Sequence, residues 1–130
     1  MTMGEARKLE APRFIKLADG MKGFAAKVYS SGADLPHFYD DDMLVLVQEP
    51  VAWTVEYRCF VLERQVVTMS VYFRNGGLAL DENGTWHSDA EADAAALSFC
   101  EGFLAAKQIA LPPACVVDVG MIAGHGWAVV

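Results

Sequence analysis

Charged and polar side chains recur at every second position in parts of residues 51–77, a spacing that could build a binding surface. One alternating set is almost entirely apolar and comprises Val55, Tyr57, Cys59, Val61, Val67, Met69, Val71 and Phe73. The other set carries Glu56, Arg58, Ser70, Tyr72 and Arg74. Because arginine is suited to bidentate contact with phosphate, this polar set is the first candidate site in the sequence.

A hairpin of two strands, joined by the polar turn Glu63-Arg64-Gln65, would position these side chains. Successive side chains of a strand point to opposite faces, so the hairpin gathers the polar set on one face and the apolar set on the other. An S-x-x-E capping pattern at Ser88 begins an alanine-rich segment with helical spacing to about Gln108. We therefore expect this helix to pack on the face of Val55 and Val67.

The rest of the chain is rich in short apolar runs that favour strands. We expect these strands at residues 13–17, 24–29, 43–47, 115–122 and 127–130. The continuous apolar run at 43–47 is typical of a strand buried on both faces. Residues 1–11 are expected to be a flexible leader, followed by a single domain over 12–130. The predicted fold class is α+β, a mainly antiparallel sheet with one principal helix.

Composition limits the function classes. A length of 130 residues suffices for one domain whose core needs neither metal nor disulfide. The net charge of −7 argues against nucleic acids and acidic membranes as partners, because both select basic surfaces. Three cysteines without C-x-x-C spacing and the lack of a membrane-length apolar run favour a cytoplasmic protein. The hydrophobic content of 54% favours a homo-oligomer that covers apolar surface.

The order of several sequence elements carries a resemblance to a known family. These elements are RFIKL, FAAKVY, VLVQEP, EYRCFVLERQVV, SVYFRNG, the alanine-rich helix, VVDVG and the terminal WAVV. Over residues 12–130 they resemble the nucleotide-binding core of ATP-grasp proteins, most closely the small bacterial and phage R-two-K clade. The resemblance implies a domain that binds ATP and Mg²⁺. It also implies a ligase that joins a carboxylate to an amine or similar nucleophile through an acyl phosphate, without identifying the substrate.

The same resemblance implies roles for individual residues. It places nucleotide contacts at Lys16, Lys27, Gln48, Glu49 and Glu56, catalytic arginines at Arg58 and Arg74, and the first magnesium ligand at Asp118. The turn Asp19–Gly23 corresponds to a glycine-bearing loop over the triphosphate, and Gln48-Glu49-Pro50 to the hinge that binds adenine. These residue types suit the chemistry, because cations neutralise phosphate and Mg²⁺ prefers carboxylate oxygens.

Two departures from the family pattern keep a second interpretation open. The resemblance leads us to expect a substrate-side domain before Pro12 and a Glu-x-Asn element after Val130, so the chain looks truncated at both ends. On this expectation the chain alone is inactive as an enzyme. The alternative is a non-catalytic relative that binds a nucleotide weakly or serves as a dimerising module.

Several candidates also have an ordinary structural explanation. Lone lysines on strands are usually solvated edge charges, and Glu56 with Arg58 could form cross-strand ion pairs of little energetic value. Asp118 lies in an otherwise apolar strand, where an unpaired buried carboxylate would be costly, so it is harder to explain in this way. The run Asp40–Asp42 is typical of a solvated loop, and the histidines lack metal-ligand spacing.

Overall fold

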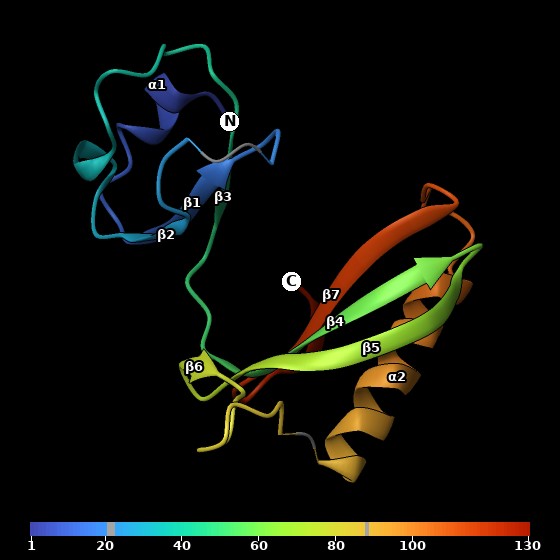
Figure 1. The fold of residues 1–130 in the computed structure, drawn as a ribbon. Helices are drawn as coiled ribbons and strands as arrows, with labels where there is room; N and C mark the ends of the chain where they lie inside the picture. Colours follow the sequence, from blue (N-terminus) through green and yellow to red (C-terminus); the bar gives the residue numbers. More distant parts are fainter. Residues whose placement is uncertain (21–22, 88) are drawn as a thin grey trace. The chain divides into compact units, whose positions relative to one another are not determined.

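The computed structural model describes residues 1–20, 23–87 and 89–130 (Figure 1). The chain divides into two compact units, Met1–Pro50 and Val51–Val130, and each is described by itself. Every pair of neighbouring strands with a described register is antiparallel, which confirms the α+β class. Among the helices of the described residues, none is long and apolar enough to cross a membrane.

The first unit is built around a three-stranded sheet with the order β2-β1-β3. Its elements are α1 (Met3–Ala6), β1 (Arg13–Leu17), β2 (Lys27–Tyr29), the 3₁₀ helix η1 (Gly32–Asp34) and β3 (Val45–Gln48). Ile15 and Leu17 are buried in the core of this unit. Because side chains alternate along β1, Lys16 points to the other face.

Two expectations for this unit are wrong. Residues 1–11 are not wholly a flexible leader, because Thr2 and Glu5 form a capping box that starts α1, and Met3 and Ala6 are completely buried. The strand predicted at 43–47 is not buried on both faces, since Leu46 is 45% exposed. This strand, β3, lies at the edge of the sheet and packs one face on the core.

The second unit contains a five-stranded sheet with the order β6-β5-β4-β7-β8. Its elements are β4 (Trp53–Leu62), β5 (Gln65–Arg74), β6 (Gly77–Leu78), α2 (Ala90–Ala105), β7 (Ala114–Ile122) and β8 (Gly126–Val129). Figure 1 shows α2 lying along this sheet. Tyr57 and Cys59 of β4 form the core with Cys100 of α2, as the alternation predicted. The Tyr57 hydroxyl donates to Asp93 of α2 at 2.5 Å and so joins the helix to the sheet.

The predicted faces of β5 are correct in its middle and wrong at both ends. The register shifts twice against β4, between Phe60 and Val61 and between Glu56 and Tyr57. Each shift is a β-bulge that adds a residue to β5 and reverses the alternation beyond it. Val66 therefore packs on the core in place of Val67, which is 66% exposed.

The bulge opposite Glu56 changes the neighbours of the last residues of β5. Phe73 lies opposite Glu56, and Arg74 lies opposite the core residue Val55. Directly opposed residues share a face of a sheet. Phe73 and Arg74 thus lie on the faces opposite to those predicted for them.

The ends of α2 depend on side chains rather than on helix propensity alone. Asp89 accepts hydrogen bonds from the N–H groups of Glu91 and Ala92, whereas the predicted cap, Ser88, lies outside the described residues. At the other end, the helix stops at Ala105 rather than near Gln108.

A hydrogen-bond donor from the hairpin explains this earlier stop. The turn has two residues, Glu63 and Arg64, with positive φ angles of 47° and 62°, as in type I′ hairpins. Arg64 donates at 3.0 Å to the carbonyl of Leu104, and its guanidinium group also bonds the carbonyls of Ala106 and Ile109. Carbonyl groups that a helix cannot satisfy by itself are thereby paired, so the chain can leave the helix here.

We expect Arg64→Ala to lower the free energy of unfolding by about 1–2 kcal/mol, because it removes a cation bound to carbonyls at a helix C-terminus. Urea denaturation followed by circular dichroism measures this loss. Glu63→Ala is the matched control, since Glu63 has the same kind of backbone conformation and an exposed side chain. Equal losses in the two variants would contradict the role assigned to Arg64.

Candidate functional site

The strands β4 and β7 bring together two of the predicted site residues on the sheet face that carries Glu56. Arg58 and Asp118 lie directly opposite each other in the register of these strands. The Nε atom of Arg58 donates to Oδ1 of Asp118 at 2.9 Å, and Nη2 donates to Oδ2 at 2.7 Å. This bidentate pair is the strongest geometry for an arginine and a carboxylate, and it holds the guanidinium group in a defined orientation.

Two further side chains join this pair. Glu56, two residues before Arg58, is only 8% exposed. Burial raises the pKa of Glu56, the charge of Asp118 raises it further, and a hydrogen bond with Tyr72 lowers it. Burial also raises the pKa of Tyr72, to about 12, and the Arg58 guanidinium lies 5.2 Å from the centre of the Tyr72 ring. We call Glu56, Arg58, Tyr72 and Asp118 the polar-face cluster.

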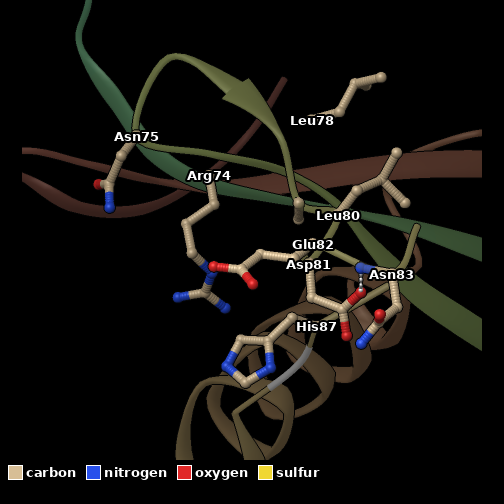
Figure 2. A pocket seen from close by; sticks show the side chains of 9 residues that line it. Arg74, Asn75, Leu78, Leu80, Asp81, Glu82, Asn83 and His87 are labelled. Atoms are coloured by element: carbon tan, nitrogen blue, oxygen red, sulfur yellow. Dashed lines mark hydrogen bonds between the residues drawn. The ribbon is translucent and has the colours of Figure 1, made fainter. Parts of the chain in front are cut away.

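Arg74 is not part of the polar-face cluster. Its position opposite Val55 places it on the core face of the sheet, so its predicted pairing with Arg58 on one face is wrong. Instead, Arg74 lines a pocket of about 600 Å³ together with Glu82 and His87 (Figure 2). A catalytic role for Arg74 stays a prediction.

The first unit holds the predicted phosphate-contacting lysines, but on opposite faces of its sheet. Lys16 lines a pocket of about 460 Å³ with Gly20 and Gly23, which belong to the predicted glycine-bearing turn. Two other residues of that turn, 21 and 22, lie outside the described residues. Lys27 pairs with Ile15, which puts it on the face away from Lys16, and its Nζ lies 5.0 Å from the centre of the Tyr29 ring.

The predicted adenine hinge coincides with the division of the chain into units. Gln48 is the last residue of β3, and Glu49 and Pro50 follow it to the end of the first unit. The side chains of Gln48 and Glu49 are exposed. They are therefore accessible to a ligand, and their contact with adenine stays a prediction.

The segment around Asp81 forms an ordered turn and carries no site prediction from the sequence. One carboxylate oxygen of Asp81 accepts hydrogen bonds from the N–H groups of Asn83 and Thr85, at 2.8 and 2.9 Å. The Asp81 N–H donates to the Thr85 carbonyl, which closes a tight turn. The D-x-N-G spacing, with Gly84 at a φ of 76°, is a recognisable signal for such a turn.

The donor set of the polar-face cluster fits Mg²⁺ only in part. Asp118 and Glu56 offer hard carboxylate oxygens, and burial, followed by the charge of Asp118, raises the pKa of Glu56. Both oxygens of Asp118, however, already accept from Arg58. Within the described residues, no group of three or more acidic, histidine or cysteine side chains gathers around one point. Mg²⁺ often binds through one or two carboxylates, with phosphates and water as its other ligands. The polar-face cluster supplies the carboxylates of that arrangement and none of its other ligands.

We expect Glu56→Gln to change how stability depends on pH. Because the pKa of Glu56 is raised by folding, the folded state holds the proton more tightly than the unfolded state does. The parent should therefore lose stability as the pH rises from 4.5, the ordinary value, through the raised pKa. Glu56→Gln should remove this loss and be more stable than the parent at pH 7.

Urea unfolding between pH 4.5 and 8 measures this dependence. Glu63→Gln is the control, since the Glu63 side chain lies exposed in the turn of the same hairpin and should keep the parent profile. The assignment would be contradicted if Glu56→Gln lost as much stability as the parent over this range of pH.

Comparison with known proteins agrees with this architecture. The family model described as the ATP-grasp domain of the R-two-K clade, family 2, matches residues 1–130. No curated protein and no solved structure matches the chain. The match covers both units, including the residues of α1 and the polar-face cluster. The chain therefore belongs to the ATP-grasp family, as an ATP-binding domain of the second family of the R-two-K clade.

Proposed function

We propose that this chain is the ATP- and Mg²⁺-binding part of a ligase that activates a carboxylate as an acyl phosphate. The observation that carries the proposal is the polar-face cluster, where an oriented arginine and two carboxylates share one sheet face. Membership of the ATP-grasp family supports the nucleotide. The carboxylate substrate, the homo-oligomer and the cytoplasmic location stay predictions from the sequence.

Within the polar-face cluster, the arginine suits a phosphate group and the carboxylates suit Mg²⁺. Arg58 keeps its Nη1 group out of the contact with Asp118, and its side chain is 49% exposed. That group can donate to a phosphate oxygen. Asp118 and Glu56 would hold Mg²⁺, which supplies positive charge against the phosphates when it is bound. In the first unit, Lys16 is proposed as a second phosphate donor beside its glycine turn.

The proposed reaction has two steps. A carboxylate oxygen of the substrate attacks the γ-phosphorus of ATP, and the bond from that phosphorus to the bridging oxygen breaks, which leaves ADP and an acyl phosphate. An amine nitrogen then attacks the acyl carbon, the carbon–oxygen bond to phosphate breaks, and the nitrogen loses a proton. Arg58 and Lys16 would contribute by orienting the phosphates and balancing their charge.

Isothermal titration with ATP and MgCl₂ tests nucleotide binding. We expect Arg58→Ala and Lys16→Ala each to weaken binding about tenfold or more, because each removes a charge-assisted hydrogen bond to phosphate. Lys107→Ala is the control for loss of one positive charge, since Lys107 is exposed and lies beyond the end of α2. We expect Asp118→Asn to reduce the effect of MgCl₂ on affinity.

Parent-like affinity in both Arg58→Ala and Lys16→Ala would contradict the roles given to these residues. The variant Lys27→Ala tests whether Lys27 contributes to phosphate binding in addition to Lys16. The contact of Lys27 with the Tyr29 ring gives this lysine a structural role. If Lys27→Ala binds ATP as tightly as the parent does, Lys16 is the only one of the two lysines that contacts phosphate.

A non-catalytic relative that binds nucleotide weakly or serves as a dimerising module is the second candidate. The bidentate ion pair of Arg58 and Asp118 favours this candidate, because each group neutralises the charge of the other without a ligand. A folded parent that shows no heat of binding with ATP and MgCl₂ would support this candidate over the ligase.

A further inference from the structure

The guanidinium group of Arg74 has hydrogen-bonding capacity that the described part of the chain does not use. Its Nε and Nη2 atoms are buried and have no hydrogen-bond partner among the described residues. A buried donor without an acceptor costs free energy, and a charged donor costs more than a neutral one. An acceptor supplied from outside the chain would remove this cost.

The two atoms concerned form one edge of the guanidinium group. Arg58 uses the same pair, Nε and Nη2, to hold both oxygens of the Asp118 carboxylate. Arg74 therefore presents the edge that binds a carboxylate side-on, but with no carboxylate bonded to it in the described residues. The comparison of Arg74 with Arg58 indicates which acceptor would satisfy Arg74, namely a planar group with two oxygens.

Arg74 lines a pocket of suitable size and mixed chemistry, with its Nε and Nη2 atoms buried beneath the pocket wall. The pocket has a volume of about 600 Å³, within the range of small-molecule sites. Figure 2 shows the guanidinium group extending toward Glu82 and His87, while Leu78 and Leu80 lie on another side. Leu80 is 41% exposed, so it could contact an apolar tail, whereas Leu78 pairs with Phe73 and shares the face of Glu56.

The walls of the pocket are held by backbone hydrogen bonds. His87 N–H donates to the Ala79 carbonyl at 2.9 Å, and Ala79 N–H donates to the Tyr72 carbonyl at 2.9 Å. Leu80 and Trp86 form an antiparallel bridge in the same segment. Arg74 itself pairs with Gly77 of β6. The pocket is thus part of the ordered sheet edge.

We propose that this pocket binds a small carboxylate with an apolar tail, held side-on by Arg74, on the sheet face opposite the polar-face cluster. The site is separate from the proposed nucleotide contacts and does not rest on the proposed function. A monoanionic carboxylate suits the pocket better than a phosphate, because Asp81 and Glu82 also line it and repel added negative charge. The ligand would take the shielded edge of Arg74 by displacing the side chains over it.

Nuclear magnetic resonance of the arginine Nε–H groups tests this site without nucleotide. Sodium benzoate, sodium acetate and sodium phosphate are titrated into the full ¹⁵N-arginine-labelled chain at constant ionic strength. We expect one Nε–H resonance, assigned by its absence in Arg74→Lys, to shift saturably with benzoate and at higher concentrations with acetate. Benzoate binding, followed by the amide resonances, should weaken about tenfold or more in Arg74→Lys, which keeps the charge and loses the two-donor edge.

Two matched substitutions control for charge and for fold. Arg58→Lys makes the same change on the other sheet face and should leave benzoate affinity within about twofold of the parent. Glu82→Gln should tighten benzoate binding several-fold by removing a like charge, whereas Glu101→Gln, an exposed position on α2, should not. If Arg74→Lys does not fold, the comparison of Glu82→Gln with Glu101→Gln decides whether benzoate binds in this pocket.

Three results would overturn the proposal. The first is the lack of any saturable shift of the Arg74 resonance with benzoate. The second is tighter binding of phosphate than of benzoate. The third is equal benzoate affinity in the parent, folded Arg74→Lys and Glu82→Gln.

Discussion

The pairing register of β4 with its two neighbours is the constraint on which the second unit depends. β4 is bonded to β5 on one side and to β7 on the other, so it sets which side chains of three strands share a face. Against β7, Arg58 meets Asp118. Against β5, the bulge opposite Glu56 shifts the partner residues, so that Arg74 meets Val55 instead of lying with the charged face. A displacement of one residue reverses a side chain completely, which is why the bulges matter more than any single contact.

The electrostatics of the polar-face cluster follow from this register. Arg58 neutralises Asp118 directly, whereas Glu56 is more deeply buried and feels the repulsion of the same carboxylate. Asp118 is thus paired, whereas burial and then the charge of Asp118 raise the pKa of Glu56. A cation or a phosphate that approached this face would therefore meet groups already coupled to one another, and binding would redistribute their charges. Such coupling is common at functional sites and also occurs in purely structural networks.

The arginines of the second unit illustrate how the surroundings of a guanidinium group decide its use. Arg58 is bonded to a carboxylate, Arg64 to backbone carbonyls at the end of α2, and Arg74 has an unsatisfied edge in a pocket. All three lie on the β4–β5 hairpin. Their side chains have the same donors, yet strand position, turn position and a bulge give them different partners. Residue type alone therefore does not distinguish a structural arginine from a binding one.

The sequence by itself determined the parts that depend on local periodicity and order. Alternation predicted the long hairpin and the core face of Tyr57 and Cys59, helical spacing predicted α2, and the order of the elements indicated the ATP-grasp family. These features were predictable because neighbouring residues produce them: side chains alternate along a strand and recur every three to four residues on a helix.

Only the tertiary structure decided which distant groups meet. Arg58 and Asp118 are 60 residues apart, so no local spacing reveals their contact. The bulge of β5 opposite Glu56 arises from pairing with β4, and it places Arg74 on the pocket face, against expectation. The burial of Met3 and Ala6 likewise depends on a core that α1 completes through long-range packing. Hydrogen bonding and packing across the chain override local pattern at these positions, because they satisfy groups that the local sequence leaves unpaired or exposed.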